Sequence, residues 1–427
     1  MKKSLFALAA VTAFAGAAQA QSSVTVYGIV DVGYAGGNAR GSTAAAVNQG
    51  TFSMLQASGG LSSNRLGFRG VEDLGGGTSA KFVLESSLQA NTDAWTPTWR
   101  QAWAGLAQKG LGEARIGTQN SMIWQLASTM TVGQLNNFSG SVINPTSIGG
   151  VSGMANPNSA DIGASGTRAN DANSLGGFTN RTQRTLQVES ERMAGLQGKA
   201  MYVLNNANNN QTAPAGGALG YAGGTNNQNG WGLSLDFNGI KNFRIAAAYQ
   251  SFNAENPYNL TAVQAAAGTG TAANGAPAIC PGNASNSTNT FTGAPTNCAN
   301  VKDNQAYVAA TYNFGILTAY ANYINRKATS AIDSNVFVSR TAQEIGVRGN
   351  VTKVVEAYAS LGNGRYQAFG AAQPTANFTG YQVGTNYLMS KRTTLYAIYG
   401  QTGTSSATAN NLTGNVNNYG MGVRHTF

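Results

Sequence analysis

The last eleven residues, 417–427, alternate between apolar and small or polar side chains up to the C-terminal carboxyl group. Side chains alternate between the two faces of an extended strand, so one face carries Tyr419, Met421, Val423 and Phe427. About 9–11 residues are enough for a tilted strand to cross a bilayer. A terminal strand of this kind needs a partner, and the sequence predicts that it pairs with the first strand of the mature chain. This pairing closes a barrel, which leaves no open sheet edge in lipid.

The first 20 residues have the pattern of a secretory signal peptide. Lys2 and Lys3 precede an apolar run, which ends before the small-residue cleavage site Ala18-Gln19-Ala20. We therefore expect residues 1–20 to be removed and residues 21–427 to form one β-barrel domain. Removing the two lysines from the 26 basic residues leaves 24 against 16 acidic ones, a net charge of +8. No later stretch approaches 18 continuous apolar residues, so no transmembrane helix is predicted.

Sixteen segments read as strands, and short turns alternate with long polar loops between them. A polar loop of small residues is expected to follow the first strand up to Leu61. Outer-membrane barrels have short turns on the periplasmic side and long loops outside. The predicted fold is therefore an all-β, 16-stranded antiparallel transmembrane β-barrel with short periplasmic turns and long extracellular loops. The expected strands are 24–34, 62–72, 78–88, 98–106, 113–119, 180–190, 196–204, 231–237, 243–252, 305–312, 316–326, 340–351, 353–361, 381–388, 393–401 and 417–427.

Four stretches resemble the general diffusion porins of Gram-negative outer membranes: SVTVYG at 23–28, NRLGFRGVEDLG at 64–75, RQAWAGL at 100–106 and RHTF at 424–427. The resemblance runs from residue 23 to residue 427 and is weak in the loops. It implies a homotrimeric channel for passive diffusion of ions and small hydrophilic solutes, with the third loop folded into the lumen. It also implies contact with outer-membrane lipid and lipopolysaccharide. Phe427 is the expected assembly signal for the barrel-insertion machinery.

In this family one wall of the constriction carries a ladder of basic residues, and the resemblance places this ladder at Arg65, Arg69, Arg100 and Arg181. The strand pattern independently turns Arg65 and Arg69 away from the apolar face. For Arg100, the lumen face follows if Trp103 faces lipid. Arg184 is a further candidate, although the family usually has an uncharged residue there. The alternative for each arginine is a mouth residue paired with a carboxylate.

The acids of the expected constriction are fewer than its arginines. The third loop, 120–179, carries only Asp161 and Asp171, and the wall adds Glu85, which Lys81 is expected to offset. One basic rung is missing, because Thr118 stands where related porins often have arginine. The surplus of positive charge predicts that small anions are preferred.

Other sequence features give narrower expectations. Cys280 and Cys298 lie in one polar stretch of an exported chain, where a disulfide is expected; two free thiols are the alternative. His425 is the only histidine, so neither a Ser/His/Asp catalytic site nor a metal site is predicted, and no cofactor is expected. No basic cluster suggests nucleic acid as a partner. Two further alternatives are a plugged barrel with a structural or adhesive role and a soluble secreted β-sandwich.

Overall fold

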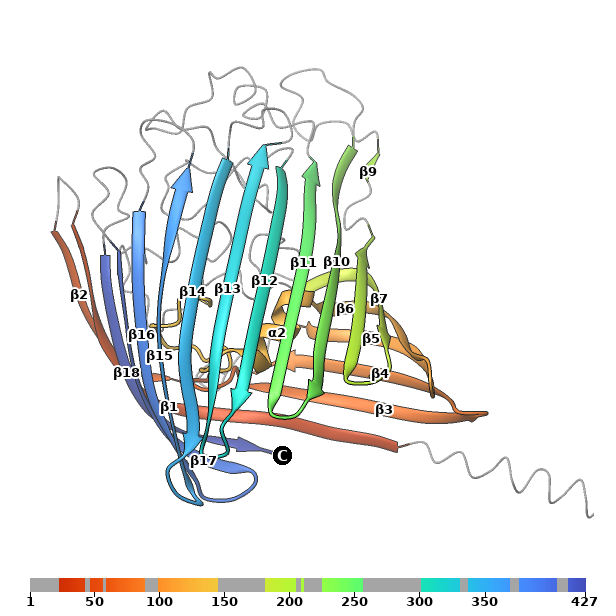
Figure 1. Ribbon diagram of the computed structural model, residues 1–427, viewed down its shortest axis with the longest axis horizontal. Helices are drawn as coiled ribbons and strands as arrows, with labels where there is room; N and C mark the ends of the chain where they lie inside the picture. Colours follow the sequence, from red (N-terminus) through yellow and green to blue (C-terminus); the bar gives the residue numbers. More distant parts are fainter. Residues whose placement is uncertain are drawn as a thin grey trace, which may run out of the picture.

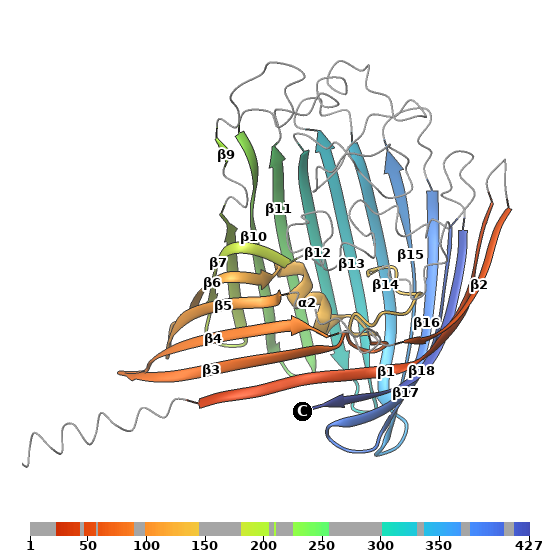
Figure 2. The same cartoon turned by 180° about the vertical axis from the view of Figure 1, so that it is seen from behind.

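The computed structural model describes residues 23–42, 47–56, 59–88, 99–144, 181–204, 209–210, 225–255, 301–330, 337–368, 376–404 and 414–427. In these ranges the chain forms one antiparallel sheet that closes on itself, with the helix α2 (Met122–Met130) inside the ring of strands (Figures 1 and 2). The strands are β1 (Ser23–Ser42), β2 (Val47–Gln56), β3 (Arg65–Gly75), β4 (Thr78–Ser87), β5 (Trp99–Gln108), β6 (Gly112–Asn120), β7 (Arg181–Ser190), β8 (Leu196–Val203), β9 (Asn209–Asn210), β10 (Thr225–Ile240), β11 (Phe243–Glu255), β12 (Val301–Asn313), β13 (Leu317–Ser330), β14 (Phe337–Asn350), β15 (Val355–Ala368), β16 (Ala376–Leu388), β17 (Thr393–Thr404) and β18 (Gly414–Thr426).

The 18 strands occupy sixteen positions around the barrel. β2 and β3 lie one after the other along the same edge of β1, because β3 pairs with Ser23–Ile29 and β2 with Gly33–Ser42. β9 and β8 likewise pair with successive parts of β10. The predicted sixteen-stranded barrel is therefore confirmed, with β2 and β9 as additions.

β2 lies in a region that the sequence analysis assigned to a polar loop. That expectation was wrong: β1 continues to Ser42, and β2 folds back on its second half. The residues involved are mostly glycine, alanine, asparagine, threonine and serine, which give almost no alternation of hydrophobicity. Pairing with a neighbouring strand, rather than the local pattern, makes this segment extended.

The barrel closes between β18 and β1, as predicted from the terminal alternation. Thirteen residue pairs join the two strands, from Ile29 with Thr426 to Gly41 with Gly414. At the end of the seam, the Phe427 N–H donates to the Gly28 carbonyl and the Gly28 N–H donates to the Phe427 carbonyl, both at 3.1 Å. The last residue of the chain is therefore part of the closed hydrogen-bond network.

Outer and inner faces of the wall differ in composition. On β16, Tyr381 and Val383 point outward and are exposed, whereas Gln382 and Gly384 are buried against the contents of the barrel. The same alternation exposes large apolar residues on the outside of most strands. No water is present in the hydrocarbon region to bond the backbone N–H and C=O groups, and in this barrel those groups are bonded by strand pairing. Within the described ranges, no helix combines the length and apolar character required to cross a bilayer.

The third loop begins inside the barrel, as the resemblance implied. Ser121 caps α2 by accepting a hydrogen bond from the Trp124 N–H, and the buried face of the helix packs on the inner wall at β10, β11 and β12. The chain then crosses to the opposite wall, where Asn136 bonds Gln382 and Ser139 bonds Asn418. The described part of this loop therefore narrows the lumen.

Tight turns join the strands at the end where the chain enters the sheet. At the β3–β4 turn, Gly75, Gly76 and Gly77 have φ values of 83°, 61° and 79°, which side chains rarely tolerate. The Asp73 carboxylate accepts the Gly75 N–H at 2.9 Å and fixes the turn. This glycine run therefore forms the tight turn between β3 and β4.

Candidate functional site

Glu85 on β4 gathers basic side chains on the inner wall. Its Oε1 accepts a hydrogen bond from Arg100 Nε at 2.9 Å and lies 3.7 Å from Arg65 Nη1. Its Oε2 accepts a hydrogen bond from the Tyr27 hydroxyl at 3.1 Å. Glu85 and Arg100 are buried, whereas Arg65 is partly exposed. The carboxylate thus orients two guanidinium groups that approach from neighbouring strands.

Arg100 reaches this group through an irregularity in β5. Glu85 pairs with Gln101 and Ser86 pairs with Trp99, so Arg100 is an extra residue in the register between β4 and β5. The prediction that Trp103 faces lipid was wrong. Trp103 shares the inner face with its pairing partner Val83, and the Arg115 guanidinium carbon lies 5.0 Å from the centroid of its ring. A regular strand with Trp103 inside would turn Arg100 outward. The irregularity turns it inward.

Arg69 and Arg181 lie on either side of this group. Arg69 is exposed on the inner face of β3, with its guanidinium carbon 5.5 Å from the centroid of Tyr27. Arg181 at the start of β7 is buried, and its guanidinium carbon lies 4.1 Å from the ring of Trp124 on α2. Arg181 also lies close enough to Arg100 and Glu85 for their charges to interact. The site therefore joins the wall to the third loop.

Arg184 occupies a different environment. The register of β6 and β7 shifts between Gly117 and Gln119, and Arg184 falls in this irregular stretch with a φ of 49°. Its side chain is exposed. The Glu85 carboxylate is contacted by Arg65, Arg100 and Tyr27.

The resulting arrangement has a surplus of positive charge. Arg65, Arg69, Arg100 and Arg181 stand against the single carboxylate of Glu85. The described part of the third loop, 121–144, contains no acidic or basic residue. The other predicted acids, Asp161 and Asp171, lie outside the described residues, as do Cys280, Cys298 and residues 1–20.

A second set of charges covers the inner wall nearer the short turns. Lys81 bonds Glu113 at 2.8 Å, and Lys199 bonds Glu189 at 2.9 Å. Arg115 lies 3.6 Å from each of the two carboxylates. The expectation that Lys81 offsets Glu85 was therefore wrong, because Lys81 pairs with Glu113 instead. Strand alternation places Glu113, Arg115 and Glu189 on one face, so their direction was available from sequence, but their pairing was not.

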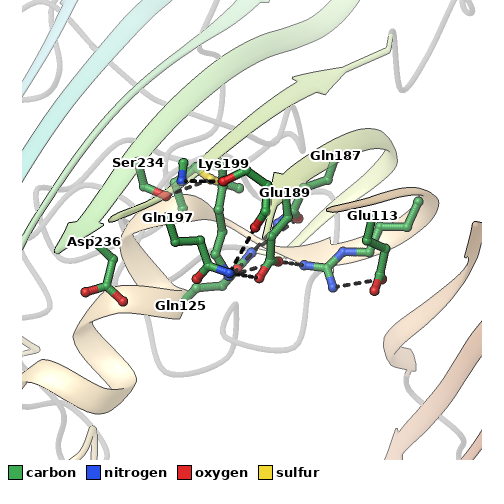
Figure 3. A network of polar contacts seen from close by, with 12 residues as sticks. Glu113, Gln125, Gln187, Glu189, Gln197, Lys199, Ser234 and Asp236 are labelled. Carbon is green, nitrogen blue, oxygen red and sulfur yellow. Dashed lines mark hydrogen bonds and ion pairs between the residues drawn. The ribbon is translucent and has the colours of Figure 1, made fainter. Parts of the chain in front are cut away.

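This set of charges also anchors α2. Gln125 of the helix bonds Gln187 at 3.2 Å and accepts a hydrogen bond from Lys199 at 3.3 Å, and Gln197 bonds Glu189 at 2.9 Å (Figure 3). Three cationic and two anionic side chains leave one positive charge here. Among the residues described, no three His, Cys, Asp or Glu side chains are grouped to hold a metal ion.

A closed barrel with an apolar outer face and a polar lumen narrowed by its third loop is a membrane-spanning β-barrel. A family model described as Gram-negative porin matches residues 7–407, and the chain belongs to this family. Family membership, together with the barrel fold, locates the protein in the outer membrane.

Curated relatives match shorter segments. The chain is 38% identical over 135 residues to an outer membrane porin protein of Bordetella pertussis, covering 29% of this chain and 34% of the relative. It is 50% identical over 88 residues to outer membrane porin protein 32 of Delftia acidovorans, covering 21% and 23%. The matched segments thus span well under two thirds of these relatives.

Solved structures share the fold over nearly the whole chain. The anion-selective porin from Comamonas acidovorans has a TM-score of 0.61 at 17% identity, covering 95% of this chain and 100% of that chain. The trimer form of OmpT from Vibrio cholerae has a TM-score of 0.55 at 13% identity, covering 95% and 99%. Both similarities are similarities of fold.

Proposed function

We propose that the protein is a pore through which ions and small hydrophilic solutes diffuse passively, and that it prefers anions. The observation that carries this proposal is the excess of guanidinium groups around Glu85, beside a stretch of the third loop that has no charged residue. A water-filled constriction selects solutes by size and by the charges on its wall. The anion-selective porin of Comamonas acidovorans, which shares the fold, supports the same sign.

The expected preference is moderate. A unit charge about 8 Å from the path changes the energy of a monovalent ion by about 2 kcal/mol at an effective dielectric constant of about 20. Counterions screen this interaction over a Debye length of about 8 Å at physiological ionic strength. A net surplus of positive charge therefore favours anions over cations without excluding cations.

The remaining parts of the proposal concern assembly. We propose that residues 1–20 are removed on export, that the mature chain forms a homotrimer in contact with outer-membrane lipid and lipopolysaccharide, and that it has no enzymatic role. The trimeric form of the OmpT structure supports the homotrimer. The insertion machinery is proposed to recognise Phe427.

Reversal potentials across a planar bilayer with a salt gradient test the proposed function. We expect step increases in conductance as single channels insert and a reversal potential of the sign set by chloride. A cation-preferring potential would contradict the proposed selectivity. Absence of conductance from correctly folded protein would instead support a plugged barrel with a structural or adhesive role.

A further inference from the structure

A second segment besides the third loop enters the barrel. Residues 59–64, between β2 and β3, form a strap that is held by Asp31 of β1. The Asp31 side chain is fully buried on the inner face, while its neighbours Val30 and Val32 point outward. Its Oδ2 accepts the Ser62 N–H at 2.8 Å, and its own N–H donates to Asn64 Oδ1 at 2.6 Å. Ser62 and Asn64 of the strap are therefore both fixed to β1.

Tyr396 of β17 completes the anchor from the adjoining wall. Its hydroxyl donates to Asp31 Oδ1 at 2.7 Å. The Tyr396 ring lies 6.5 Å, between centroids, from the ring of Phe138 in the third loop, and Leu61 of the strap packs against the apolar cluster that contains both rings. A Cβ added to Gly60 would lie 2.3 Å from the Tyr396 hydroxyl oxygen. The strap thus fits closely against the tyrosine.

The strap connects this anchor to the constriction. The Ser63 carbonyl accepts a hydrogen bond from Arg65 Nε at 3.1 Å. The third loop binds the other end, because the Asn137 N–H donates to the Gly60 carbonyl at 2.9 Å and the Asn137 Nδ2 donates to the Gly59 carbonyl at 2.8 Å. One short segment therefore contacts both a basic residue of the wall and the loop that narrows the lumen.

We propose that Asp31 and Tyr396 are positioning residues of the constriction. They hold residues 59–64 against the wall, and these residues fix the direction of Arg65 and the place of the third loop. A buried carboxylate that accepts hydrogen bonds from a hydroxyl and a backbone N–H is a strong anchor. Neither side chain needs to touch a passing solute. This inference rests on the proposed channel function but not on the sign of its selectivity.

Substitution of Asp31 by asparagine distinguishes this role from a simple charge effect. As a negative charge near the lumen, Asp31 would weaken anion preference, and Asp31→Asn would then strengthen it. If Asp31 acts as an anchor, the substitution removes its charged acceptor and loosens the strap. The lumen then widens, and Arg65 is no longer held in one direction. Asp31→Asn then raises conductance and lowers anion preference. The two roles predict opposite shifts in reversal potential.

Tyr396→Phe separates geometry from charge, because it removes one hydrogen bond and leaves the carboxylate in place. Loss of a typical hydrogen bond increases the population of the released strap about five-fold. Tyr358→Phe is the matched control, since the Tyr358 hydroxyl is buried on the inner wall without a hydrogen-bond partner in the described structure. Heat-modifiable gel mobility confirms that each variant forms a barrel.

Single-channel conductance, open-channel noise and reversal potential are measured for the three full-length variants and the wild type. The proposal predicts higher conductance and noise with lower anion preference for Asp31→Asn and Tyr396→Phe, and wild-type values for Tyr358→Phe. If Asp31→Asn does not fold, Tyr396→Phe alone tests whether the anchor positions the constriction. Wild-type conductance and noise in Tyr396→Phe would overturn the proposal. A cation-preferring wild type would refute the proposed selectivity and leave the conductance test of the anchor valid.

Discussion

Glu85 orients two of the four arginines of the site. It binds Arg100 at 2.9 Å and lies 3.7 Å from Arg65, while Arg69 and Arg181 contact aromatic rings instead. A carboxylate in this place reduces the net charge, and it also keeps two guanidinium groups directed toward the lumen. Substitutions at the wall should therefore change selectivity according to the sign of the charge removed.

Replacing Arg100 by glutamine should lower the anion-to-cation permeability ratio. One unit charge is lost beside the path, and after screening this corresponds to roughly a three-fold change or more. Arg392→Gln is the control, because it makes the same change in the exposed β16–β17 turn. Reversal potentials of the two variants give the comparison. Equal values would exclude Arg100 from the selective region.

Replacing Glu85 by glutamine should have the opposite effect. The site gains one net positive charge, so anion preference should rise in the same salt-gradient measurement, while the amide oxygen still accepts one hydrogen bond from Arg100 or Tyr27. Glu191→Gln, in the exposed β7–β8 turn, controls for the change in total charge. A fall in anion preference would mean that orientation of the arginines outweighs their number.

The residues of the site were only partly predictable from sequence. Arg65 and Arg69 follow from strict alternation in β3. Arg100 does not, because its direction depends on a register shift against β4, which a single strand cannot reveal. The resemblance alone pointed to Arg100, since Trp103 lies on the inner face and not toward lipid. Tyr27 and Trp124 enter the site through contacts between distant strands and the third loop.

Among the larger elements, the third loop depends on Glu344 for its attachment to β14. The buried Glu344 carboxylate accepts hydrogen bonds from Ser141 Oγ at 2.9 Å and from the Val142 N–H at 3.0 Å. Arg340, four residues earlier on the same strand, donates to the Val142 carbonyl. Two side chains on the same face of β14 thus hold both backbone groups of a single loop residue.

Glu344→Ala should loosen the loop while the barrel remains folded. Hydrogen bonds to a charged group contribute about 1.5–3 kcal/mol each, and the variant loses two of them at the loop but none between strands. We expect more open-channel noise and higher conductance in single-channel recordings. Glu191→Ala, in an exposed turn, should match the wild type. A quiet channel of wild-type conductance in Glu344→Ala would show that other contacts suffice to hold the loop.

The elements themselves differ in how well sequence predicts them. Strands with alternating large side chains, such as β16 and β18, were expected near their observed places. In β2 the apolar residues follow no regular alternation, and β9 is two asparagines, so these segments become strands by pairing with β1 and β10. The strap at 59–64 has no local pattern. Its conformation depends on contacts with residues far away in the sequence, such as Tyr396, which lies against Gly60 and bonds Asp31.

For the whole molecule, closure was predictable because many weak local signals agree. Hydrophobicity alternates only weakly along each strand. The regular alternation of tight turns and long loops, however, is compatible with few topologies other than a closed barrel. Closure also removes the unpaired edge that lipid would not tolerate. The contents of the lumen depend on contacts between residues far apart in sequence, so neither the position of the third loop on β14–β18 nor the anchor at Asp31 followed from local patterns.

Deleting Phe427 should reduce the amount of folded barrel. The deletion removes both backbone hydrogen bonds to Gly28 at the end of the β1–β18 seam, and it also removes the outward aromatic ring proposed to be read during insertion. Unpaired backbone groups are costly in lipid, so the seam is weakened where it meets the membrane boundary. Heat-modifiable gel mobility of outer-membrane fractions measures the folded share.

Two substitutions separate the two effects of that deletion. Phe427→Ala keeps the backbone pair with Gly28 and removes the ring, whereas Phe427→Tyr keeps both. If the ring is the assembly signal, Phe427→Ala should resemble the deletion and Phe427→Tyr the wild type. If seam hydrogen bonds dominate, Phe427→Ala should fold normally and only the deletion should fail. Wild-type levels of folded barrel after the deletion would contradict both roles, because the remaining pairs between β18 and β1 would then be sufficient to close the barrel.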